Sequence, residues 1–127
     1  MEKEKDYLRL VEELLKNYKK AKFNKAVFGF YHLEKLITIK NMEQEEEEAI
    51  ITTLERSIEN IKKYPEKGEI YYDIIQSLFI KEQKTTLREL TKKYSISLSS
   101  VFSYKTTAVA IIADLFKDFY VKEELSC

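Results

Sequence analysis

Residues that break helices are scarce in this chain of 127 residues, which has only two glycines and one proline. Leucine, isoleucine, lysine and glutamate are abundant instead, and most of these residues favour helices. This balance disfavours a fold with many tight turns and predicts an all-α protein. The length suits one domain with a core of modest size.

The chain also has only one cysteine and one histidine, and its net charge is zero. The only cysteine, Cys127, cannot form an internal disulfide, which suits a reducing cytoplasm. The lone His32 has no cysteine near it, and the chain has neither a glycine-rich phosphate loop nor a Cys/His set with metal-ligand spacing. We therefore expect no enzymatic activity, no cofactor and no metal. The 22 basic and 22 acidic residues give a net charge of zero, so attraction to nucleic acid must come from local asymmetry.

Long apolar runs are missing as well. No run approaches the roughly 20 apolar residues that a membrane-spanning helix needs. The first residues, MEKEKDYLRL, are too charged for a signal peptide. We expect a soluble cytoplasmic protein that does not contact membranes.

Two stretches of helical periodicity occupy residues 1–64, where we expect a long-helix hairpin. The first apolar seam has the 3-4-3 spacing of a coiled coil or of a helix packed on a core, and consists of Leu8, Val11, Leu15 and Tyr18. The second seam repeats this spacing with Ile51, Leu54, Ile58 and Ile61. Asn24 and Gly29 are candidate bends, so residues 4–40 form either one helix or two. Pro65 and Gly68 close the second helix and give the clearest boundary in the chain.

Runs of like charge flank these seams. The acidic run from Glu43 to Glu48 suits a helix N-terminus, where the helix dipole favours carboxylates. A metal site would need converging ligands, and no histidine or aspartate accompanies this run. The lysine run from Lys16 to Lys25 is typical of a solvated helix face, with phosphate binding as the alternative.

Residues 66–127 form a C-terminal module in which two helices meet at a tight turn. After an apolar stripe between Ile70 and Phe79, Thr85 or Thr86 caps the next helix, and Ser97 or Ser99 caps the last. The apolar residues around the turn are Leu87, Leu90, Tyr94, Ile96, Val101 and Tyr104. This spacing predicts a DNA-binding helix-turn-helix, with a plain helical hairpin as the alternative. In this motif, Ser95 occupies the turn position that usually has glycine.

The last helix begins near Leu98 or Ser99 and runs past Tyr120. It is longer than a helix-turn-helix needs, so we expect its C-terminal half to pack on the N-terminal helices or on a second subunit. Basic residues outnumber acidic ones between Lys81 and Lys105, as expected for a local DNA-binding surface. The candidate DNA-contacting residues are Lys84, Arg88, Lys92, Lys93, Ser97, Ser99, Ser100, Phe102, Ser103, Lys105 and Thr106.

The segment from Ile70 through LRELTKKYSISLSSVFSYKTTAVAIIADLF resembles the C-terminal helix-turn-helix of sigma factors. It looks more like phage transcriptional regulators of the ArpU and RinA type, which carry such a module. Their pattern at the start of the recognition helix is matched here by Ile96, Ser97, Ser99 or Ser100, and Val101. The chain departs from it at Leu98 and Phe102, where related modules often have arginine or another polar residue. The resemblance implies control of phage or prophage transcription through promoter DNA, with RNA polymerase as a further partner.

Two questions stay open from the sequence. The same helices suit a protein–protein adaptor that acts on RNA polymerase or another regulator without reading DNA. The two seams can also pair within one chain or between two. We favour a homodimer slightly, because paired half-sites increase affinity and specificity for DNA.

Overall fold

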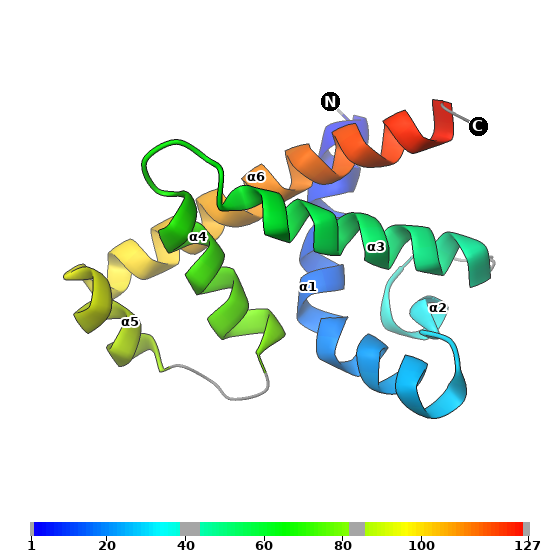
Figure 1. Ribbon diagram of the computed structural model, residues 1–127, viewed down its shortest axis with the longest axis horizontal. Helices are drawn as coiled ribbons and strands as arrows, with labels where there is room; N and C mark the ends of the chain where they lie inside the picture. Colours follow the sequence, from blue (N-terminus) through cyan, green and yellow to red (C-terminus); the bar gives the residue numbers. More distant parts are fainter. Residues whose placement is uncertain (1, 39–43, 82–85, 126–127) are drawn as a thin grey trace.

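The computed structural model describes residues 2–38, 44–81 and 86–125 (Figure 1). The protein is all-α and 86% helical, with six α-helices and no strand in these ranges. The helices are α1 (Glu2–Phe28), α2 (Leu33–Leu36), α3 (Gln44–Ile61), α4 (Gly68–Ile75), the π-helical η1 (Gln76–Ile80), α5 (Leu87–Tyr94) and α6 (Leu98–Leu125).

The sequence did not decide whether residues 4–40 form one helix or two. The structure has one long helix, α1, followed by the short helical turn α2. α1 continues through Asn24 and ends at Phe28, next to Gly29, whose φ of 87° lies in the left-handed region. The side-chain amide of Asn24 donates a hydrogen bond to the carbonyl oxygen of Tyr31, 3.0 Å away, and so ties the end of α1 to the following turn. Gly29 is therefore the bend, and α2 follows as a separate turn of helix.

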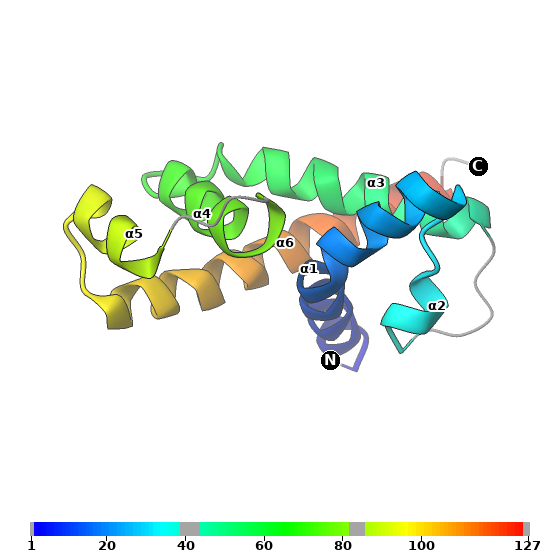
Figure 2. The same ribbon diagram turned by 90° about the horizontal axis from the view of Figure 1, so that it is seen from below.

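α6 is the helix on which α1, α3, α4 and α5 pack. Figures 1 and 2 show it running along the long axis of the molecule, with α3 beside it and α1 crossing it. α1 and α3 each pack more extensively on α6 than on each other. The two long helices that were expected to pair as a hairpin thus meet mainly through α6, whose apolar residues Val109, Ile112 and Phe116 belong to the same core as both seams.

The larger core takes residues from α1, α2, α3, α4 and α6. All of the second seam is buried, and Leu54 and Ile61 are fully inaccessible to solvent. The second half of α6 belongs to this core through Ile112 and Phe116, which confirms that it packs on the N-terminal helices. The boundary expected at residues 64–66 coincides with the α3–α4 turn, and the core takes residues from both sides of it.

Gly68 allows the close approach at this turn. A Cβ atom there would lie 2.2 Å from the carbonyl oxygen of Lys62, so no larger residue fits without a shift of the backbone. The sequence suggested that Gly68 closes α3, whereas the structure places it as the first residue of α4. α3 has already ended at Ile61, and Pro65 lies exposed in the turn.

Within the described ranges, no single helix has both the length and the apolar composition of a membrane span. The bent pair of α5 and α6 meets that test only when the two helices are taken together, by length and composition alone.

Candidate nucleic-acid interface

α5 begins with a side-chain cap. The hydroxyl of Thr86 accepts a hydrogen bond from the backbone N–H of Glu89 at 3.1 Å, which satisfies one of the free donors of the first turn. Thr86 is thus a cap of α5, while the other candidate, Thr85, lies outside the described residues. The acidic Glu89 in this first turn also suits the helix dipole.

The turn between α5 and α6 has three residues, Ser95, Ile96 and Ser97. Ser95 has a φ of 53° and thus takes the left-handed conformation that glycine usually supplies at a helix C-terminus. The N–H of Ile96 donates to the carbonyl oxygen of Thr91 at 3.1 Å and closes α5. The hydroxyl of Ser97 accepts from the N–H of Ser100 at 3.1 Å, so Ser97 is the residue that caps α6.

α5 and α6 meet at an angle of 94°. Helix-turn-helix motifs have angles of about 90–120° and turns of three or four residues. Figures 1 and 2 place this corner at the opposite end of the molecule from α2. The first turns of α6 therefore project beyond the part of the protein that is covered by α1 and α3.

A small second core holds the corner at this angle. Its fully buried residues are Ile74 from α4, Leu90 from α5 and Val101 from α6. The partly buried residues packed against it are Ile70, Leu78, Leu87, Tyr94, Ile96 and Tyr104. All six apolar residues that the sequence assigned to the motif lie in this cluster. The contribution of Ile74 makes α4 the third helix of the module.

An ion pair that the sequence analysis missed ties α5 to α4. The ammonium of Lys93 lies 2.7 Å from a carboxylate oxygen of Asp73, and the hydroxyl of Tyr94 donates to the same oxygen at 2.6 Å. Burial alone would raise the pKa of Asp73, but the hydrogen bonds from Lys93 and Tyr94 outweigh it and lower this pKa. Lys93 therefore already has a carboxylate partner, which makes it a weaker candidate for phosphate than the sequence suggested.

The polar face expected on α6 is largely present. Ser99, Phe102, Ser103 and Thr106 are all exposed and lie on one side of the helix by their spacing. The hydroxyl of Thr106 donates to the carbonyl oxygen of Phe102 at 3.1 Å. Ser100 belongs to the cap instead, because its side chain is half-buried and its hydroxyl lies 3.0 Å from that of Ser97.

The expected basic residues fall into two groups. Arg88 and Lys92 are exposed one turn apart on α5, and neither forms an ion pair with a described residue. Lys105 is half-buried and its ammonium lies 5.7 Å from the centre of the Phe79 ring, on the side of α6 that faces η1. Lys84 lies outside the described residues. The structure thus leaves two clear phosphate-binding candidates, both on α5.

No protein-family model, no curated protein and no solved structure matches this chain. The geometry of the α5–α6 corner therefore carries the functional argument.

Proposed function

We propose that this protein is a DNA-binding transcriptional regulator that inserts the first turns of α6 into the major groove. The observation that carries the proposal is the 94° corner between α5 and α6, which is held by its own small core and presents an exposed face of hydroxyls. In this proposal, residues 66–127 are a sigma-factor-like helix-turn-helix module. The N-terminal long helices support it and provide a surface for a homodimer.

The exposed side chains on α6 can contact DNA bases but suit only modest discrimination between base sequences. The hydroxyls of Ser99, Ser103 and Thr106 can donate to base edges or accept from them, and the Phe102 ring can contact a thymine methyl group. None of these side chains offers the two parallel donors with which arginine reads guanine. The protein should therefore discriminate modestly between sequences, with much of its affinity coming from phosphate contacts.

Phosphate binding rests first on Arg88 and Lys92. Because the net charge of the protein is zero, no overall field attracts it to DNA, and these local cations on α5 must supply the attraction. Lys84 and Lys105 are further candidates. Lys93 acts mainly by holding α5 on α4 through Asp73.

The resemblance of the Leu87–Phe116 segment to phage regulators of the ArpU and RinA type adds the biological setting. We propose that the protein controls phage or prophage genes in the cytoplasm, without enzymatic activity. Promoter DNA is the main ligand in this proposal, and RNA polymerase is a further partner.

Capture of genomic DNA fragments, followed by sequencing, would supply the ligand for a direct test. Binding to an enriched duplex is then measured by fluorescence anisotropy over a salt series. Each phosphate contact that is lost should lower the slope of log K against log salt by about 0.9. Lys92→Gln should weaken binding to every duplex and reduce the slope by about this amount, whereas Ser103→Ala should change which fragments are preferred.

Lys93→Gln is the matched control, since it removes the same charge from the neighbouring exposed position. We expect a smaller change in slope for this variant, because the Lys93 ammonium already compensates Asp73. If the wild-type protein binds no duplex even at low salt, the DNA-binding proposal fails.

A second candidate function is that of a protein–protein adaptor acting on RNA polymerase or another regulator. The observation that favours it is the exposure of two large apolar side chains on α6, Leu98 at 49% and Phe102 at 48%. Exposed apolar residues on a presented helix suit a protein groove. Under this alternative, Phe102→Ala should abolish the capture of purified RNA polymerase, and the wild-type protein should not bind duplex DNA.

A further inference from the structure

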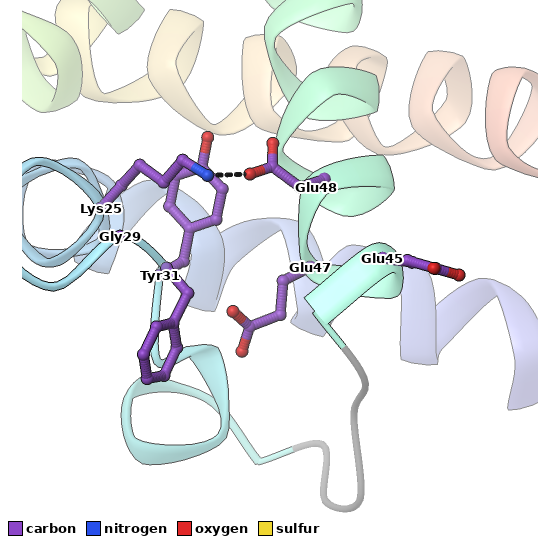
Figure 3. Close-up of a pocket in the computed structure, with 7 residues that line it drawn as sticks. Lys25, Gly29, Tyr31, Glu45, Glu47 and Glu48 are labelled. Atoms are coloured by element: carbon purple, nitrogen blue, oxygen red, sulfur yellow. Dashed lines mark hydrogen bonds and ion pairs between the residues drawn. The ribbon is translucent and has the colours of Figure 1, made fainter.

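A pocket of about 200 Å³ lies between the end of α1 and the first turns of α3. Figure 3 shows its lining, which comes from Lys25, Gly29, Phe30, Tyr31, Glu45, Glu47 and Glu48. The pocket lies beside α2, and Figures 1 and 2 place α2 and α5 at opposite ends of the molecule. It is therefore separate from the candidate DNA-binding corner.

Glu47 is the unusual residue in this pocket, because it is a buried carboxylate with an unused oxygen. Its side chain belongs to a residue that is only 4% exposed. One oxygen, Oε2, accepts the backbone N–H of Leu33 at 2.9 Å. The other, Oε1, is buried and has no hydrogen-bond partner in the part of the chain that the structure describes. Burial of a carboxylate oxygen without a donor is costly, which points to a missing partner.

Among the described residues that line the pocket, Lys25 carries the only ammonium, and it already has a carboxylate partner. Lys25 is hydrogen-bonded to Glu48, and this bond raises the pKa of the Lys25 ammonium. In Figure 3 the carboxylate of Glu47 points from α3 toward the segment that contains Gly29 and Tyr31, whereas Glu45 is directed away from it. The described lining residues carry three carboxylates and one ammonium, so this part of the lining is net negative, and Glu47 is the group left in it to receive a cation.

The rest of the lining favours an organic cation over a metal ion. Among the described residues, no three carboxylate, imidazole or thiol groups converge closely enough to hold a metal. Two aromatic residues, Phe30 and Tyr31, supply apolar walls that suit an alkyl chain. The Lys25 ammonium already lies 5.4 Å from the centre of the Tyr31 ring, and the Phe30 ring packs on His32 with the ring centres 3.9 Å apart, so the aromatic residues contribute apolar contact and Glu47 contributes the charge. One free carboxylate oxygen beside aromatic walls matches the chemistry of a protonated amine.

We propose that this pocket binds a small protonated alkylamine, whose ammonium donates a hydrogen bond to Oε1 of Glu47 and whose chain lies against Phe30 and Tyr31. The site is independent of DNA binding. The competing explanation is that Glu47 serves only to hold the N–H of Leu33 at the start of α2. The experiment must therefore remove the charge of Glu47 and keep that hydrogen bond.

Glu47→Gln meets this requirement, because the amide oxygen of glutamine can still accept the Leu33 N–H. Glu46→Gln is the matched control, since Glu46 is the neighbouring exposed carboxylate and does not line the pocket. Titration of the ¹⁵N-labelled protein with n-butylamine near pH 7 is followed through the amide resonances of Gly29, Tyr31 and Leu33. A ligand with so few atoms should bind with a Kd in roughly the millimolar range, which this method measures.

We expect saturable shifts with n-butylamine in the wild-type and Glu46→Gln proteins, and none with neutral n-butanol. Loss of a hydrogen bond to a charged group should raise the Kd of Glu47→Gln by about 10- to 100-fold. An unchanged Kd in Glu47→Gln, equal binding of n-butanol, or tighter binding of calcium at the same resonances would each overturn the proposal.

A second pair of variants protects the test against misfolding of Glu47→Gln. Phe30→Ala removes one aromatic wall and should weaken n-butylamine binding several-fold. Phe23→Ala, at a residue of α1 that is 61% exposed and outside the pocket, should leave the Kd unchanged. Equal Kd values for these two variants would also contradict the assignment.

Discussion

The small core behind the α5–α6 corner can be tested by comparing two leucines in the same module. Leu90 on α5 is 0% exposed, and Leu98, the first residue of α6, is 49% exposed. Leu90→Ala and Leu98→Ala make the same chemical change, so intrinsic differences between leucine and alanine largely cancel. What remains is the difference in burial between the two positions.

The magnitude follows from the structure. Truncation of leucine to alanine removes three carbon groups, and at about 0.8 kcal/mol each their burial contributes roughly 2.4 kcal/mol. A cavity adds to this loss wherever the surroundings cannot collapse. Ile74 and Val101 pack beside Leu90 from two other helices, so little collapse is expected. We expect Leu90→Ala to lower the unfolding free energy by about 3–5 kcal/mol and Leu98→Ala by less than about 1 kcal/mol.

Urea denaturation followed by circular dichroism measures this difference, and amide hydrogen exchange locates it. Because Leu90 belongs to the small core and not to the larger one, its truncation should reduce protection in α5 more than in α3. Equal urea midpoints for the two variants would refute the assignment of Leu90 to a fully buried position between α4 and α6. A loss of protection spread evenly over α3 and α5 would refute the separation of the two cores.

Three further predictions concern single positions, each measured by urea denaturation. Ser95→Gly should raise the unfolding free energy by about 1 kcal/mol, because Ser95 has a φ of 53°, while Ser95→Ala should give no gain. Gly68→Ala should lower the unfolding free energy by about 1–3 kcal/mol, because a Cβ atom at this position would lie 2.2 Å from the carbonyl oxygen of Lys62. A variant as stable as the wild type would contradict this close approach and show that the turn can widen. The pKa of Asp73 is lowered in the folded protein, because hydrogen bonds from Lys93 and Tyr94 outweigh the effect of burial. The contribution of the Asp73 carboxylate to stability is therefore complete above its unfolded pKa of about 3.9, and it is lost as the pH falls through the lower folded pKa. The stability difference between wild type and Asp73→Asn should therefore be smaller at pH 3 than at pH 7, and an equal difference at both would contradict this linkage.

Local patterns in the sequence predicted the helices and the apolar skeleton of the corner. Leu87, Leu90 and Tyr94 have helical spacing within α5, and Val101 and Tyr104 have it within α6. This spacing determines which side of its own helix each set shares, whatever that helix packs against. The sequence predicts two candidate capping residues for each helix, Thr85 or Thr86 for α5 and Ser97 or Ser99 for α6. The structure selects Ser97, because its hydroxyl accepts the N–H of Ser100 in the first turn of α6.

Contacts between distant segments could not be predicted in this way. Asp73 and Lys93 are 20 residues apart, and nothing in their local sequence shows that α4 and α5 bring them together. The sequence pattern likewise predicts phosphate binding for Lys93 and Lys105 as well as for Lys92. The fold turns Lys93 toward Asp73 and Lys105 toward Phe79, and leaves Lys92 exposed.

The acidic run from Glu43 to Glu48 likewise separates what the local sequence predicts from what tertiary contacts decide. Sequence alone predicted that this run suits the start of a helix, because the helix dipole acts on any carboxylate in the first turn, which here contains Glu45, Glu46 and Glu47. Only the tertiary structure decided that Glu47 is buried, with one oxygen that has no hydrogen-bond partner among the described residues, while Glu46 remains in solvent. The physical reason is that the dipole is a property of one helix, whereas burial depends on which segments pack against it, here the turn that follows α1.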